Sequence, residues 1–502
     1  MATLKYSWYA AGADTTISNY ERLVTKEFRH TNAFYTNKFM TDVAPMLISF
    51  GTNIAKPGIA KNGDKLYASN KELINIIYED FHQKGDPFLV DSGGFLCSIG
   101  KVPRQYIPKM IEYYVKYIKE NCEDPLYDDM LYFYLDIVPI AGLKKEEALE
   151  HMIHFHNHLK KSISHISGAL DKMILVLQCS NNNTYEVFNK FIHETALVDL
   201  HSHKYSQGSL VPLNFNNYFI SPWIIGLMDV IDIERDNLTN GTVIQFHLLG
   251  TSSPTEMILI SWLNILFESR GINIIITFDS TAAINNASRS GILHYYDPNN
   301  KEHPITEFFT KYNTLKDKVL NRIDKNGRNY TNEDYINMCL ADMSKEIVFN
   351  TRCNGMLYDS NGRWTPLANT FLQVYENYSY SKIFDYILSV NKQYKDWIIN
   401  EDLNSRLREL TYKILVEFNG GYNLTNKKGS KLNSTTARLL NSLMLIRMHL
   451  DNKLPEKYSS KQIVDSYFKN NGLTTNERDA GNIMQNISQT KFSAPKEVIN
   501  NA

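Results

Sequence analysis

Several features that would set this chain apart from an ordinary folded protein are scarce in its sequence. It has only five cysteines in 502 residues, an odd and scattered set that argues against a disulfide framework and favours a reducing compartment. Its most apolar stretch, MILISWLNILF at 257–267, is too short to cross a bilayer and predicts a buried helix. The formal net charge of -1 excludes a strong overall attraction to nucleic acid, so such binding would need a local basic patch.

The composition that remains is typical of a folded soluble protein, with 43% hydrophobic and 21% charged residues. The first residues, MATLKYSWYAAG, lack the basic segment and apolar run of a secretory signal. We therefore expect a cytoplasmic protein with no membrane partner.

Short apolar runs recur between residues 44 and 280 and alternate with stretches long enough for helices, such as 103–122 and 146–159. Runs that are apolar on both faces are typical of buried parallel strands. Their repetition predicts an α/β fold, and their number favours a (β/α)8 barrel of the TIM type over an open sheet. The seven runs are APMLISFG (44–51), DPFLVDSGG (86–94), MLYFYLDIV (130–138), KMILVLQCS (172–180), SPWIIGLMD (221–229), TVIQFHLLG (242–250) and INIIITFDS (272–280).

The pattern changes near residue 300, beyond which long amphipathic helices rich in Tyr, Asn and Lys are predicted. We expect a barrel over 1–300, an α-helical C-terminal extension over 301–470 and a polar, weakly ordered tail over 471–502. The eighth strand is not placed by the pattern. It could fall within 300–365, where EIVFNTRC at 346–353 is one candidate.

Polar residues stand at the ends of the predicted strands. In a closed barrel these ends meet at one mouth, so three carboxylates and an amide there predict a functional site. The competing interpretation is that Asp91 and Asp279 only cap strand ends. The residues are Asp91, Asp136, Gln178, Gly226 (within its run) and Asp279.

The motifs VDSGGF, VLQCS, IIGLMD, HLLGTSSP and TFDS resemble, in order, those of the tRNA-guanine transglycosylases. Members of that family are (β/α)8 barrels that exchange a guanine in nucleic acid for a 7-deazaguanine. The resemblance implies that Asp279 is the nucleophile, which attacks the sugar's anomeric carbon and forms a covalent intermediate. It implies that Asp91 is the general acid and base. Two carboxylates about an anomeric carbon also suit a retaining displacement on chemical grounds, without a redox cofactor or catalytic metal.

The same resemblance implies a binding site for the base. Asp136 and Gln178 would read the polar edge of guanine, Phe95 and Leu249 would sandwich the ring, and backbone near Gly226 and Leu227 would meet the carbonyl oxygen. Ser92 and Gly93 belong to the same substrate-binding turn, and Gly93 and Gly94 would let the backbone approach the base.

Departures from the family pattern bear on the polynucleotide. The tRNA enzymes carry a structural zinc site, whereas only Cys339 and Cys353 follow the expected nucleophile here and Ala368 stands at the apparent histidine position. Two distant cysteines are too few for such a site, so we expect no metal. In this respect the chain resembles the 7-deazaguanine DNA transglycosylases of phages and bacterial modification systems, and a phage-encoded protein of this kind would be located in the host cytoplasm. The expected partners are guanine in DNA, or in tRNA, and a free 7-deazaguanine such as 7-cyano-7-deazaguanine.

A basic stretch at 427–461 carries eight Lys or Arg against two acidic residues and could contact phosphate or form a solvated helical face. The candidate contacts are Arg289, Lys427, Lys428, Lys431 and Arg438. Three other functions stay open: the same exchange on tRNA, a catalytically silent subunit, and a glycoside hydrolase. A homodimer or an accessory protein also stays open.

Overall fold

The structure of this chain is a computed structural model, and it describes a large part of the 502 residues. The described residues are 8–11, 46–51, 59–82, 85–137, 143–178, 190–200, 202–208, 210, 220–251, 253–280, 292–297, 299, 305–309, 322–323, 329–330, 366–400, 406–411, 414 and 427–451.

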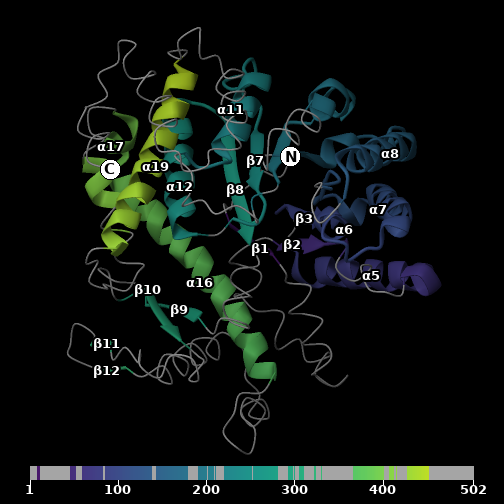
Figure 1. The fold of residues 1–502 in the computed structure, drawn as a ribbon, viewed down its shortest axis with the longest axis horizontal. Helices are drawn as coiled ribbons and strands as arrows, with labels where there is room; N and C mark the ends of the chain where they lie inside the picture. The colour runs from purple at the N-terminus through teal and green to yellow at the C-terminus, as the bar shows by residue number, and fades with distance from the viewer. Residues whose placement is uncertain are drawn as a thin grey trace, which may run out of the picture.

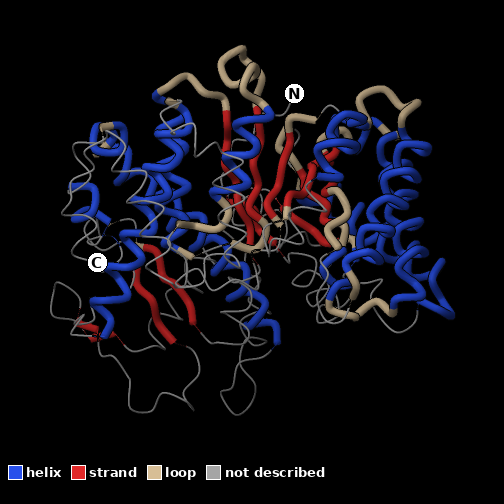
Figure 2. Tube along the Cα trace, turned by 45° about the horizontal axis from the view of Figure 1, so that its top comes forward, coloured by secondary structure: helices blue, strands red, loops and turns tan. Residues whose placement is uncertain are grey.

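A curved sheet of parallel strands lies at the centre, with helices around it (Figures 1 and 2). Each strand pairs with the next one along the chain, and β1 also pairs with β8, for example Tyr9 beside Asp279. The fold is therefore α/β, as the alternating pattern predicted. The strands are β1 (Trp8–Ala11), β2 (Met46–Ser49), β3 (Phe88–Asp91), β4 (Met130–Phe133), β5 (Met173–Leu177), β6 (Lys204–Gln207), β7 (Ile244–Leu248) and β8 (Ile274–Ser280).

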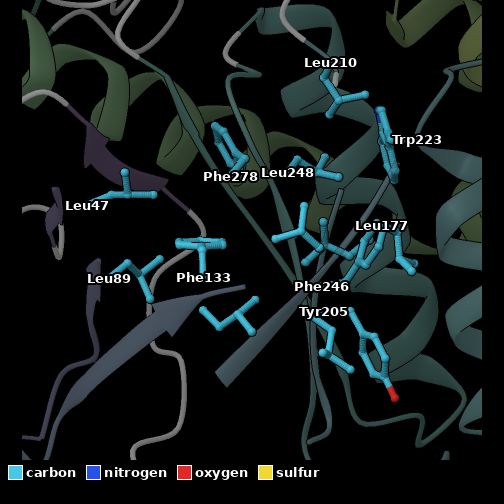
Figure 3. Packing of buried hydrophobic residues seen from close by; sticks show 14 of the residues in the cluster. Leu47, Leu89, Phe133, Leu177, Tyr205, Leu210, Trp223, Phe246, Leu248 and Phe278 are labelled. Atoms are coloured by element: carbon cyan, nitrogen blue, oxygen red, sulfur yellow. The ribbon is translucent and has the colours of Figure 1, made fainter. Parts of the chain in front are cut away.

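The strands are apolar because both of their faces are covered. Every residue of β4, β5 and β7 is buried, which explains why these runs are continuous rather than alternating. Figure 3 shows part of the hydrophobic cluster, to which different strands contribute Leu47, Leu89, Phe133, Leu177 and Leu248. The packed interior leaves the ends of the strands as the place where polar side chains can gather.

Helices follow most strands and cover the sheet. Ser253 begins α12 by accepting a hydrogen bond from the backbone N–H of Glu256 at 3.3 Å, and Pro254 suits the first helical position. The predicted buried helix at 257–267 lies within α12 and is confirmed. The helices are α5 (Ile59–Phe81), α6 (Gly94–Ser98), α7 (Ile107–Cys122), α8 (Lys145–Ile163), α10 (Leu197–Leu200), α11 (Ile224–Ile233) and α12 (Pro254–Ser269).

One predicted strand is wrong. The run at 221–229 lies largely in helix α11, and the strand at this place in the sheet is β6, with the sequence KYSQ. Periodicity cannot separate a short buried helix from a buried strand, and the alternating polar residues of β6 hid it. Strand β1 was also missed, while each of the other six runs contains a strand. The candidate eighth strand at 346–353 lies outside the described residues.

The C-terminal helices α16 (Pro366–Gln393), α17 (Lys395–Ile399) and α19 (Lys427–Leu450) pack against α12 (Figure 1). This explains why α12 is apolar all round: one side faces the sheet and the other faces these helices. An antiparallel pair, β9 (Ile292–Tyr296) and β10 (Ile305–Phe309), is tied to α16 because Glu376 accepts from the backbone N–H of His294 at 2.8 Å. A shorter pair joins β11 (Arg322–Ile323) to β12 (Asn329–Tyr330). No helix among the described residues is long and apolar enough to cross a membrane.

A buried ion pair fastens α19 to α12. Arg438 donates to one oxygen of Glu256 at 2.7 Å, and the indole N–H of Trp223 donates to the other oxygen at 2.7 Å. Both charged side chains are almost inaccessible to solvent. Burial makes each charge depend on its partner, because an unpaired charge in this environment would lose its hydration without compensation.

We expect Arg438→Met to lower the free energy of unfolding by about 3–5 kcal/mol, because it leaves the carboxylate of Glu256 buried without its cation. Urea denaturation would measure the loss. The double variant Arg438→Met with Glu256→Gln should recover part of it. Lys382→Met is the matched control at an exposed pair with Asp385, expected to cost less than about 1 kcal/mol. Equal losses of unfolding free energy in Arg438→Met and Lys382→Met would contradict the role given to the buried ion pair.

Candidate functional site

The four polar side chains expected at the strand ends lie at one rim of the sheet. Asp91 is the last residue of β3, Asp136 and Gln178 follow β4 and β5, and Asp279 lies near the end of β8. They lie close enough to interact. Gln178 donates its amide N–H to Asp136, and the negative charge of Asp91 raises the pKa of Asp136. The charge of Asp279 in turn raises the pKa of Asp91. The predicted gathering of these residues is confirmed.

The turn after β3 explains how the rim is built. Gly93 has a φ of 75°, a conformation that residues with a Cβ rarely adopt, and its Cα lies against the backbone of Gly51. A Cβ at Gly94 would overlap the carbonyl oxygen of Asp136. Both glycines therefore allow the end of β3 to pack directly on the neighbouring strand ends. The DSGG sequence is required for close backbone packing, which is one reason for its residue types.

Asp91 has a raised pKa. Burial is the largest cause, and the charge of Asp279 adds to it, whereas hydrogen bonds from the Ser49 side chain and from the backbone N–H groups of Gly93 and Ser92 oppose it. The Gly93 N–H lies 3.2 Å from Oδ2 of Asp91. A raised pKa favours the protonated form of the carboxyl group, which is the form that a general acid uses.

Asp136 is 7% exposed, and burial raises its pKa to about 7. The hydrogen bond from Gln178 opposes this shift, and the charge of Asp91 adds to it. The hydroxyl of Ser92 accepts from the backbone N–H of Asp136 at 3.4 Å and from that of Gly94 at 3.2 Å. Ser92 thus joins the turn after β3 to the segment that carries Asp136.

Asp279 is 5% exposed and is held through one oxygen. Its Oδ1 accepts from the backbone N–H of Gly250 at 3.1 Å and lies 3.1 Å from Nε2 of His247. His247 was not among the predicted site residues. The signal that could have found it is a histidine inside the buried run TVIQFHLLG, three residues before its end.

The two predicted ring contacts stand at the rim with part of their surface accessible. Phe95 follows Gly94 in α6 and is 38% exposed, which is unusual among the phenylalanines that the structure describes. Leu249 follows β7 and is half-buried. An exposed aromatic ring beside buried carboxylates is the composition expected of a site for a flat, polar-edged ligand.

The strand predicted to carry Gly226 and Leu227 is a helix, and their contact with the base stays a prediction. Both lie in α11, and the backbone N–H of Leu227 is used by the helix, since it donates to Trp223 at 3.1 Å. Gly226 lacks a side chain for a local reason, because a Cβ there would overlap the amide oxygen of Gln207. Gly208, which was not predicted, lies directly at the rim, because a Cβ there would lie 2.8 Å from Oδ2 of Asp136.

The prediction that Arg438 contacts nucleic acid is wrong. Its side chain is 3% exposed and bound to Glu256, so a phosphate cannot reach it. Lys427, Lys428 and Lys431 lie in α19, and their side chains are outside the described part of the chain, as is Arg289. Within the described ranges, no group of three or more His, Cys, Asp or Glu could hold a metal ion. Cys339 and Cys353 fall outside those ranges.

Comparisons with known proteins do not assign the chain to a family. A scan of protein-family models found no family that matches the chain, and a search of curated proteins found no relative. The rim residues and the motifs that contain them are therefore the only indications of function among the described residues.

Proposed function

We propose that this chain is a nucleic-acid guanine transglycosylase, which exchanges guanine for a 7-deazaguanine base. The observation that carries the proposal is the pair of carboxylates Asp91 and Asp279 at one rim, close enough for the charge of one to raise the pKa of the other. Two carboxylates with different environments are the groups that a retaining displacement at an anomeric carbon uses. The pairing of β1 with β8 supports a complete (β/α)8 barrel as the scaffold.

In the proposed first displacement, an oxygen of Asp279 bonds to the anomeric carbon while the bond from that carbon to guanine breaks. The electron pair leaves with the base, and Asp91 supplies the proton that the base takes up. In the second displacement, the incoming base gives its proton to the Asp91 carboxylate and attacks the same carbon. The electron pair of the carbon–oxygen bond returns to Asp279, and two inversions retain the configuration.

Recognition of the base would fall to Asp136 and Gln178. An ionised carboxylate can accept from both N1–H and the amino group of guanine, a pattern that no other base presents on that edge. Phe95 and Leu249 would contact the faces of the ring. The described rim has both kinds of group, apolar surface and buried polar atoms, that base binding requires.

We favour DNA over tRNA as the polynucleotide, because the sequence lacks the cysteine spacing of the tRNA enzymes' zinc site. Asp279 is 5% exposed at the rim, so the target nucleotide would have to leave the base stack to reach it. A 7-deazaguanine such as 7-cyano-7-deazaguanine is the proposed incoming base, and the cytoplasm is the proposed compartment.

Incubation with radiolabelled guanine tests the proposal, because a base-exchanging enzyme also returns guanine to the polymer. Duplex DNA, single-stranded DNA and tRNA would be tested separately, and label retained in polymer would be counted. We expect label in DNA that an excess of 7-cyano-7-deazaguanine displaces. Label only in tRNA would keep the chemistry and contradict the choice of DNA. No label in any polymer from a folded protein would contradict the enzyme and favour a silent subunit.

A further inference from the structure

We propose that His247 is a positioning residue that holds Oδ1 of Asp279, so that Oδ2 is the oxygen that attacks the sugar, and that Thr277 fixes the imidazole in this role. The proposal rests on the function proposed above for Asp279. It concerns His247 and Thr277, two residues to which the transglycosylase resemblance assigned no role.

The three side chains share one face of adjacent strands. His247 on β7 is paired in register with Thr277 on β8, and Asp279 is two residues further along β8. Side chains at positions i and i+2 of a strand lie on the same face. Nδ1 of His247 accordingly lies 2.8 Å from the hydroxyl oxygen of Thr277, and Nε2 lies 3.1 Å from Oδ1 of Asp279.

The partners determine where the imidazole carries its proton. An ionised carboxylate only accepts hydrogen bonds, so Nε2 of His247 must carry a hydrogen to bond Asp279. In the neutral ring Nδ1 is then an acceptor, and the hydroxyl of Thr277 is the donor that satisfies it. All three residues are buried, and the ring also packs against Phe133, with 5.3 Å between centroids. Rotation of the imidazole would leave polar atoms without partners in a dry environment.

The arrangement distinguishes the two oxygens of Asp279. Oδ1 accepts from His247 and from the backbone of Gly250, and neither of these bonds uses Oδ2. When Oδ2 bonds to the sugar, Oδ1 becomes the carbonyl oxygen of a glycosyl ester. When the ester is broken, charge returns to the carboxylate, and the two donors at Oδ1 stabilise it as a leaving group. His247 should therefore matter most in the second displacement.

The test follows the covalent intermediate. Wild-type protein would be incubated with single-stranded and duplex DNA and with tRNA, the adduct would be isolated, and its decay on addition of excess guanine would be timed. We expect His247→Phe, which keeps a ring against Phe133 but removes both nitrogens, to slow this decay roughly 10- to 100-fold. His247→Gln keeps an N–H donor and should recover part of the rate.

Substitution of the supporting hydroxyl gives a matched pair. Thr277→Val keeps the shape and removes the hydrogen bond, and we expect decay of the adduct to slow roughly threefold to tenfold. Thr277→Ser keeps the hydroxyl and should behave as wild type. Nitrogen chemical shifts of the His247 ring, measured on the intact chain, should report hydrogen on Nε2 in wild type and a mixture of forms in Thr277→Val.

The outcomes separate the two proposals. An adduct that resolves at the wild-type rate in folded His247→Phe would overturn the positioning role and leave the transglycosylase intact. Hydrogen on Nδ1 alone in wild type would also overturn it, because Nε2 could not then bond Asp279. No adduct with any polymer in wild type would overturn the proposed function and the positioning role together.

Discussion

Replacement of Asp279 by asparagine is expected to lower base exchange by on the order of 10⁴-fold or more, because an amide cannot form the covalent intermediate. Asparagine keeps the size of the side chain and retains an oxygen for the backbone N–H of Gly250. The fold should therefore persist, with a melting temperature close to that of wild type. Retention of labelled guanine in polymer measures exchange, and a denaturing gel measures the adduct, which should disappear.

Replacement of Asp91 by asparagine should lower exchange by roughly 10²- to 10⁴-fold, the usual contribution of a general acid. The adduct should still form slowly, which distinguishes this variant from Asp279→Asn. Asp128→Asn is the matched control: it makes the same chemical change just before β4, away from the rim, at a side chain paired with Lys172. Wild-type exchange in either rim variant would contradict the proposed roles.

The raised pKa of Asp91 gives its role a physical basis. Asp91, Asp136 and Asp279 lie close enough to interact, and three ionised carboxylates in a poorly hydrated rim repel one another. Retention of a proton on one of them relieves the repulsion. Asp279 accepts from two donors at Oδ1, whereas burial raises the pKa of Asp91 and that of Asp136. The environments of the carboxylates thus differ, as we would expect if one were the nucleophile and another the acid of a displacement.

Much of the sheet could be predicted because long-range burial leaves a local signature. Strands β4, β5 and β7 are covered on both faces, so their sequences are continuously apolar, and this was visible without a structure. Strand β6 was missed because its four residues, KYSQ, include polar members and carry little pattern, and strand β1, WYAA, is an equally short run. The helix α11 was mistaken for a strand because it is buried by α19 as well as by the sheet.

Some residues of the candidate site could likewise be predicted from the sequence, and others could not. Asp91, Asp136, Gln178 and Asp279 could be predicted because each ends a recognisable strand. The position of Gly208 could not, since it depends on locating β6. Arg438 looked like a phosphate contact because its charge is plain in the sequence, whereas its partner Glu256 is 182 positions away. Pairing at such separations is a property of tertiary packing and leaves no local pattern.

Guanine should bind more tightly as the pH rises through about 7, because this is the pKa to which burial raises Asp136. Below that pH the carboxyl group carries a proton and loses its capacity to accept from both N1–H and the amino group. Because the pKa is about 7, the ionised form that binds guanine is half populated at that pH, is nearly complete by pH 8 and is depleted below pH 7. Affinity should therefore fall about tenfold for each pH unit below 7, or roughly 100-fold by pH 5.

Equilibrium binding of radiolabelled guanine to the protein without polynucleotide, from pH 5 to pH 8, would measure this dependence. Asp136→Asn should bind roughly 100-fold more weakly at pH 8 and should show little change with pH, since an amide does not ionise in this range. Asp91→Asn provides a second comparison: removal of its charge from the neighbourhood of Asp136 should lower the pKa of Asp136 and move the midpoint to lower pH. A midpoint that stays at the wild-type pH in Asp136→Asn would show that another group controls binding and would remove Asp136 from the recognition site.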